Sequence, residues 1–193
     1  MNRGPAAAVP AAPLALGTGS GGGLRREFPA AVSAFDPAPH TWPASPPAPF
    51  ADELVSHDDV NLDNVVSRAD RAVALIDFDL AGPGSRIWDV ACAAQLWAPL
   101  RPLQHVEEAG RGRSLTRVRL LVDSYGLDDA ELDRLVAAVR LNHEWCYDIA
   151  GTAAVDGHPG FAQYWDGGAR DRAERTRQWY LDTADVPRDA LLC

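Results

Sequence analysis

The pattern of apolar and polar positions divides the chain into a short β region and a helical C-terminal part. Two runs rich in β-branched and aliphatic residues, 65–67 and 72–76, flank a polar turn and predict a β-hairpin. Apolar residues then recur at intervals of three or four positions, which is typical of amphipathic helices. The sequence therefore predicts an α+β fold with one small hairpin and about four helices, at 86–97, at 115–125, after Asp128 and at 161–181.

Local signals mark where these elements begin and end. Ser85 is placed as the N-cap of the first helix, and Asp128 with Glu131 three residues later predicts a capping box. Gly126 follows the second helix at the position where a C-terminal glycine is common. The segments 81–84 and 157–160 are rich in Gly and Pro, and we expect both to be turns.

The first quarter of the chain has a different composition. Residues 1–27 are mostly Ala, Pro and Gly, and we expect a disordered tail there. Residues 28–53 form a Pro-rich connector, because six prolines within 35–50 exclude a regular helix or a central strand. Trp42 and Phe50 are the expected anchors of this connector. Residues 54–193 are then one folded unit.

Composition excludes several classes of partner. The 193 residues carry 27 acidic and 18 basic side chains, a net charge of −9, and every basic residue is arginine. This balance argues against a nucleic-acid partner. No apolar run is long enough to span a bilayer, so no membrane partner is expected. The three cysteines follow no disulfide or metal-binding spacing, which fits a reducing, cytoplasmic location.

Polar residues of one particular order surround the predicted hairpin. The chain reads His-Asp-Asp at 57–59, Asn at 64, Ile-Asp-Phe at 76–78 and Asp-Val-Ala at 89–91. This order resembles the C-terminal lobe of the aminoglycoside phosphotransferase and choline kinase group, in which His-Gly-Asp-Leu-His-x-x-Asn precedes Ile-Asp-Phe and an Asp-Leu-Ala helix. The chain departs from that pattern at Asp58, where Gly is usual, and at Asn61, where a second His is usual.

The resemblance implies a protein-kinase-like C-terminal lobe at 54–193 and an ATP- and Mg²⁺-dependent transfer of phosphate to a small-molecule hydroxyl. Asp59 would be the catalytic base. Asn64 and Asp77 would supply the oxygen ligands of Mg²⁺. His57 and Asp89 would support the loop structurally. Neither the nucleotide-binding residues nor the acceptor follow from these motifs, and aminoglycosides, choline and sugars remain open.

Each motif residue also has a simpler interpretation. The acids and amides at 58–64 are common turn formers, and Asp77 follows a predicted strand where a solvated acid is ordinary. Taken singly, these interpretations are favoured. The joint order of the motifs is difficult to obtain by chance and favours kinase-like ancestry.

One half of the expected machinery has no counterpart in the sequence. Enzymes of this group need an N-terminal lobe with a nucleotide-covering loop and a lysine, and this chain contains no lysine. We therefore expect a truncated phosphotransferase, weakly active or inactive alone, with a missing N-lobe as its partner. The alternative is a non-catalytic, pseudokinase-like module for binding or homodimerisation. A third possibility is an unrelated helical protein with a fortuitous motif.

Overall fold

The computed structural model describes residues 35–42, 44–51, 54–68, 71–98, 100 and 114–182. The predicted tail at 1–27 and the centre of the predicted hairpin turn lie outside the described residues. The elements in chain order are η1 (Ala48–Phe50), β1 (Leu54–Ser56), η2 (Leu62–Asn64), β2 (Val65–Arg68), β3 (Arg71–Leu75), β4 (Gly82–Gly84), α2 (Arg86–Trp97), α3 (Ser114–Tyr125), α4 (Asp129–Val155), α5 (Pro159–Tyr164), η5 (Trp165–Ala169) and α6 (Arg170–Asp182).

The described β structure consists of two small antiparallel sheets. Strands β2 and β3 pair with Val65 opposite Leu75, which confirms the predicted hairpin. Strands β1 and β4 also pair, with Ser56 opposite Gly82. This second sheet is a correction, because the sequence predicts only a turn at 81–84. It forms because Gly82 and Gly84, which lack Cβ atoms, allow β4 to approach β1 closely: a Cβ on Gly84 would meet the Ser56 hydroxyl.

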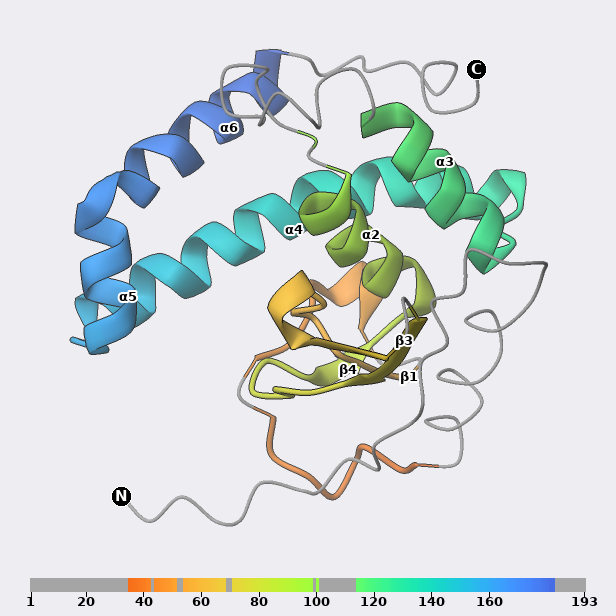
Figure 1. The fold of residues 1–193 in the computed structure, drawn as a ribbon, viewed down its shortest axis with the longest axis horizontal. Helices are drawn as coiled ribbons and strands as arrows, with labels where there is room; N and C mark the ends of the chain where they lie inside the picture. The colour runs from red at the N-terminus through yellow and green to blue at the C-terminus, as the bar shows by residue number, and fades with distance from the viewer. Residues whose placement is uncertain are drawn as a thin grey trace.

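Helix α2 lies at the centre of the molecule, between the β elements and α4 (Figure 1). It begins as predicted, because the Ser85 hydroxyl accepts the Trp88 backbone N–H at 3.3 Å. Trp88 is fully buried, and its ring lies 5.7 Å from both the Phe50 ring and the Trp145 ring. Phe50 thus anchors the Pro-rich connector to the core, as expected, and burying such a ring is worth roughly 1.5–3 kcal/mol.

The turn between α3 and α4 is built by the predicted capping signals. Asp128 accepts the Glu131 backbone N–H, and Glu131 in return accepts the Asp128 backbone N–H, both at 2.9 Å. Gly126 has φ 62°, a left-handed backbone that suits glycine. The Arg86 guanidinium donates to the Tyr125 carbonyl at 2.8 Å, which ties the start of α2 to this turn.

The last predicted helix, 161–181, is interrupted. The chain forms α5, then the π-helical segment η5, then α6, and the break lies at Gly168, which has φ 91°. Helix α6 then returns along α4 (Figure 1). The Arg177 side chain holds it there by donating to both carboxylate oxygens of Glu144, at 2.9 and 2.7 Å.

The described structure confirms the predicted α+β class. Three of the predicted helices are present close to their expected bounds, and the fourth is the pair α5 and α6. Among the described residues, no helix combines the length and the apolar character required to cross a bilayer.

Candidate active site

The segment 57–64 forms a loop between β1 and β2 that His57 fixes from inside. The His57 side chain is fully buried. Its Nδ1 accepts the backbone N–H of Asp59 at 3.3 Å, so Nε2 carries the proton and donates to the Ile76 carbonyl at 3.0 Å. One neutral imidazole therefore joins the loop to the strand end that precedes Asp77.

The environment of His57 favours this neutral form. Burial lowers the pKa of the imidazole, although the Ile76 carbonyl and the charge of Asp59 favour the protonated form. The Phe78 ring lies 4.3 Å from the imidazole ring, measured between centroids, and covers it. A buried, neutral histidine with both ring nitrogens bonded to backbone is suited to positioning the loop.

Two asparagine side chains hold the Asp59 carboxylate. The Asn64 amide nitrogen donates to Asp59 Oδ2 at 3.1 Å and to its backbone carbonyl at 2.9 Å. The Asn61 amide nitrogen donates to Oδ1 at 3.1 Å. The carboxylate is half-buried and its orientation is fixed, as a base acting on a bound hydroxyl requires.

The structure brings Asn64 next to the strand end that carries Asp77. The Ile76 backbone N–H donates to the Asn64 carbonyl at 3.0 Å. Asp77 itself is exposed and has φ 63°, a left-handed backbone that is uncommon outside glycine. Strained backbone of this kind is concentrated at functional sites.

These two residues fit a magnesium ion through their chemistry. The Asn64 amide nitrogen is used by Asp59, which leaves its Oδ1 as the atom for a metal, and Asp77 offers an exposed carboxylate. Mg²⁺ commonly binds through one or two protein oxygens, with water and phosphate completing the shell. Within the described ranges, no group of three or more His, Cys, Asp or Glu residues is placed to hold a metal ion. A metal bound here would therefore need water and phosphate as further ligands.

Asp89 reaches the loop from α2. Its Oδ1 accepts the backbone N–H of His57 at 3.2 Å across 32 positions of sequence. Burial raises the pKa of the Asp89 carboxyl to about 7, while the backbone N–H groups of His57 and Asp58 favour its charged form. The carboxyl therefore changes charge near neutral pH while it holds the loop.

Several residues of the site did not follow from the motif alone. Asn61 orients Asp59, and its only sequence signal is the tendency of Asn to bond to backbone two residues on, seen here in the 2.8 Å bond from the Asp63 N–H. The Trp97 indole donates to the Val60 carbonyl at 2.6 Å and holds the middle of the loop. No local pattern could have revealed that bond, because it spans 37 positions.

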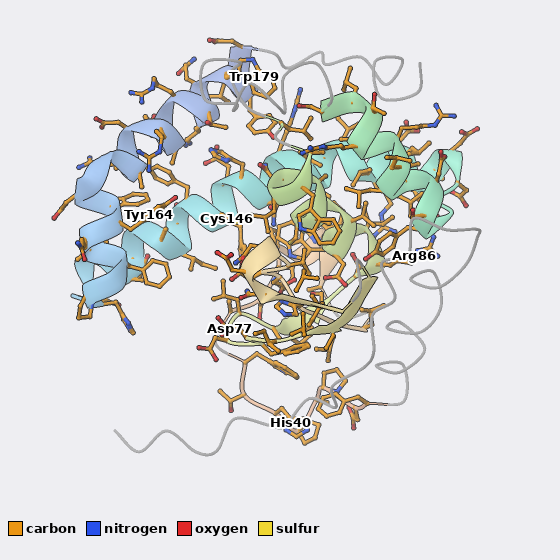
Figure 2. The ribbon with its side chains drawn as sticks, in the orientation of Figure 1. His40, Asp77, Arg86, Cys146, Tyr164 and Trp179 are labelled. Atoms are coloured by element: carbon orange, nitrogen blue, oxygen red, sulfur yellow. The ribbon has the colours of Figure 1, made fainter. Side chains whose placement is uncertain are left out.

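Helix α4 passes over the loop. In Figure 2 the labelled Cys146 of α4 lies above Asp77, which is at the edge of the β elements. The Cys146 thiol also interacts electrostatically with the Asp59 carboxylate. Glu144, on the same helix, is engaged by Arg177, so its charge is already compensated.

A comparison with models of protein families gives a match. The model of a family described as the phosphotransferase enzyme family matches residues 23–121, a range that contains the loop, the hairpin and α2. Neither the search of curated proteins nor the search of solved structures found a significant match.

Proposed function

The chain belongs to the phosphotransferase enzyme family, and from this premise we propose that it transfers the γ-phosphate of ATP, with Mg²⁺, to a hydroxyl group of a small molecule. The described β elements and helices would form the kinase-like C-terminal lobe of that enzyme. Phosphoryl transfer requires mainly that the reacting groups be positioned and the phosphate charge be neutralised.

The observation that carries this proposal is the double role of Asn64. Its side chain orients the Asp59 carboxylate, and its backbone carbonyl accepts the N–H of Ile76, the neighbour of Asp77. Asn64 thereby links the base for the acceptor hydroxyl, Asp59, to the carboxylate for the metal, Asp77. A turn of solvated acids would have no need of such cross-links.

Each residue then has a distinct task. Asp59 accepts the proton of the acceptor hydroxyl as the phosphate is transferred. Asn64 and Asp77 would hold Mg²⁺, which would neutralise part of the phosphate charge when bound. His57 and Asp89 keep the loop in place and do not touch the reacting atoms.

The test compares Asp59→Asn with Asp63→Asn in the purified chain. Asp63 is an exposed acid of the same loop and serves as the matched control. Transfer from γ-labelled ATP would be followed with Mg²⁺ and a panel containing an aminoglycoside, choline and a sugar. We expect Asp59→Asn to lower the transfer rate by about 10²-fold or more, as loss of a general base does. Measurable but equal rates in the two variants would refute the assignment of Asp59, and no transfer by the wild-type chain would count against the proposed activity.

The buried acid Asp58, which stands in a left-handed backbone next to the candidate base, favours a second candidate, a non-catalytic binding module. Under this alternative the site binds Mg²⁺ and ATP without turning over, and the chain acts by docking a partner or a second copy. Calorimetric binding of Mg²⁺ and ATP together with no transfer to any acceptor would favour it.

A further inference from the structure

Asp58 occupies a position that an acidic residue is poorly suited to fill. It has φ 63°, a left-handed backbone that a residue with a Cβ adopts with strain. Its side chain is only 3% exposed, and neither carboxyl oxygen has a hydrogen-bond partner in the structure. An unfavourable residue between His57 and Asp59 calls for a role in the loop.

A matching donor lies beside this carboxyl. The indole Nε1 of Trp88 is buried and also lacks an acceptor. The Trp88 indole and the Ser56 hydroxyl are both near enough to favour the charged form of Asp58. The Ser56 hydroxyl already donates to the Gly82 carbonyl at 3.3 Å, which leaves the indole as the uncommitted donor.

The other titratable groups facing Asp58 in the described structure are acids and thiols. Asp89 and Cys92 come from α2, and Cys146 comes from α4. Burial and then the charge of Asp89 raise the pKa of the Asp58 carboxyl well above its ordinary value. Burial also raises the pKa of the Cys92 thiol, so this thiol adds no charge near neutral pH.

We propose that Asp58 is a positioning residue that works in its protonated form: its carbonyl oxygen accepts the Trp88 indole N–H, and its O–H donates to the Asp89 carboxylate. Asp89 already accepts the His57 backbone N–H. The Asp58 side chain would then add to the contacts that the backbone N–H groups of His57 and Asp58 already make with Asp89, immediately before Asp59.

This arrangement makes the loop sensitive to pH. Loss of the Asp58 proton places a second negative charge beside Asp89 and removes the O–H donor, so the fastening is lost as pH rises. The site around Asp59 is then less well positioned. The inference rests on the proposed function only for the consequence at Asp59, because the proposed contact with Trp88 requires no nucleotide.

The test follows the indole N–H signals of the ¹⁵N-labelled full chain by NMR, without nucleotide. The Trp88 signal is assigned by its loss in Trp88→Phe. In the wild type we expect this signal to shift with pH, with a midpoint above the ordinary carboxyl range, and its N–H to exchange slowly with solvent. Asp58→Asn keeps a carbonyl acceptor and should retain slow exchange, but its signal should lose the titration step of Asp58 and keep at most the step near pH 7 that Asp89 contributes.

Asp58→Gly removes the acceptor and relieves the strained backbone, so the indole N–H should exchange at least 10-fold faster. Asp63→Asn is the control and should behave as the wild type does. A Trp88 titration in Asp58→Asn with the same midpoint and amplitude as the wild type would overturn the proposal. An unchanged exchange rate of the Trp88 indole N–H in Asp58→Gly would also overturn it. If Asp58→Gly does not fold, the Trp88 titration in Asp58→Asn decides alone.

A purely structural role would leave the pH profile of turnover unaffected. With a phosphotransferase assay, the alkaline decline in kcat should move in Asp58→Asn while KM stays within about 2-fold. If the NMR result holds and turnover is absent, the contact stands and only the proposed function fails. If turnover occurs but the NMR result fails, the proposed function stands and the contact between Asp58 and Trp88 is wrong.

Discussion

The backbone N–H of Ile76 donates to the Asn64 carbonyl at 3.0 Å and joins the two halves of the candidate site. One partner ends η2 and the other follows β3. The hairpin between them thus brings residues 12 positions apart into contact. This bond fixes the backbone at Ile76. Asp77 follows immediately and has a left-handed backbone, so the chain changes direction there.

Removing the charge of Asp77 should weaken binding of Mg²⁺ and ATP together. Asn is the suitable replacement, because it tolerates a left-handed backbone and keeps the shape of the side chain. We expect Asp77→Asn to raise the Kd for ATP in the presence of Mg²⁺ by about 10-fold, since one charge-assisted metal contact of roughly 1.5 kcal/mol is lost. Isothermal calorimetry at constant ionic strength measures this change.

Binding of ATP without Mg²⁺ provides the internal control for that variant, and Asp63→Asn provides the matched one. Asp63 is exposed and belongs to the same loop, so it reports any general effect of lost negative charge. If Asp77→Asn and Asp63→Asn changed the affinity equally, Asp77 would be a solvated acid and not a ligand.

The hairpin and helix starts were predictable because their signals are local. The capping box at Asp128 and the N-cap at Ser85 depend on residues three positions apart, and both are present in the structure. The pairing of β1 with β4 was not predictable, because Gly82 and Gly84 carry no side-chain pattern. The break at Gly168 does have a local signal, the Gly167-Gly168 pair, but the sequence on both sides of it favours a helix.

The site shows the same division. The motif predicts the order of His57, Asp59, Asn64 and Asp77. In the structure, hydrogen bonds between side chain and backbone link the first three, and the Ile76 N–H joins Asn64 to the residue before Asp77. The metal and catalytic roles remain predictions. The partner of the Val60 carbonyl lay on α2, which only a three-dimensional structure can supply.

The free energy of unfolding should fall as pH rises from about 4 to 7. Burial raises the pKa of Asp89 to about 7, against about 3.9 in an unfolded chain, so the folded state binds the extra proton in this interval. The resulting stability is complete below the unfolded pKa and is lost as pH rises through the folded one. Urea unfolding at several pH values measures it.

Two variants separate the contributions to that pH dependence. Asp89→Asn keeps an oxygen acceptor for the His57 N–H and should make the curve less steep between pH 4 and 7, and Asp58, whose pKa burial also raises, supplies the slope that remains. His57 acts in the opposite direction, because burial lowers its pKa and its contribution is lost as pH falls below about 6.5. If the free energy of unfolding of Asp89→Asn fell with pH as steeply as that of the wild type, the buried Asp89 carboxyl would not be its cause.

The capping box at the start of α4 should contribute more than the ion pair attached to it. Glu131 accepts the Asp128 N–H at 2.9 Å and also lies 3.4 Å from the Arg86 guanidinium. We expect Asp128→Ala to cost about 1 kcal/mol, as loss of an N-cap does. Glu131→Gln keeps an acceptor and loses only a partly exposed ion pair, so a cost of about 0.5 kcal/mol is expected.

Chemical denaturation of the two variants under one buffer condition gives the comparison. Arg86→Ala serves as a further check, because it removes the ion pair together with the bond to the Tyr125 carbonyl. Equal destabilisation by Asp128→Ala and Glu131→Gln would indicate that the charge, and not the cap geometry, holds this turn.

Close approach of β4 to β1 predicts that Gly84 cannot be replaced, whereas Gly160 can. A Cβ at Gly84 would meet the buried Ser56 hydroxyl and come within 3.2 Å of Pro46, so Gly84→Ala overpacks the sheet beside the loop. Overpacking costs about 1–3 kcal/mol. At Gly160, in α5, nothing lies within 4 Å of an added Cβ, and alanine should stabilise the helix by roughly 0.5–1 kcal/mol.

The two alanine variants are therefore expected to shift Tm in opposite directions, and thermal unfolding followed by circular dichroism measures both. Because Ser56 immediately precedes His57, the strain at Gly84 should also reach the loop. Gly84→Ala should then weaken binding of Mg²⁺ and ATP even where the variant is fully folded, while Gly160→Ala should leave it unchanged. A destabilised but fully binding Gly84→Ala variant would show that the β1–β4 sheet supports the fold without positioning the site.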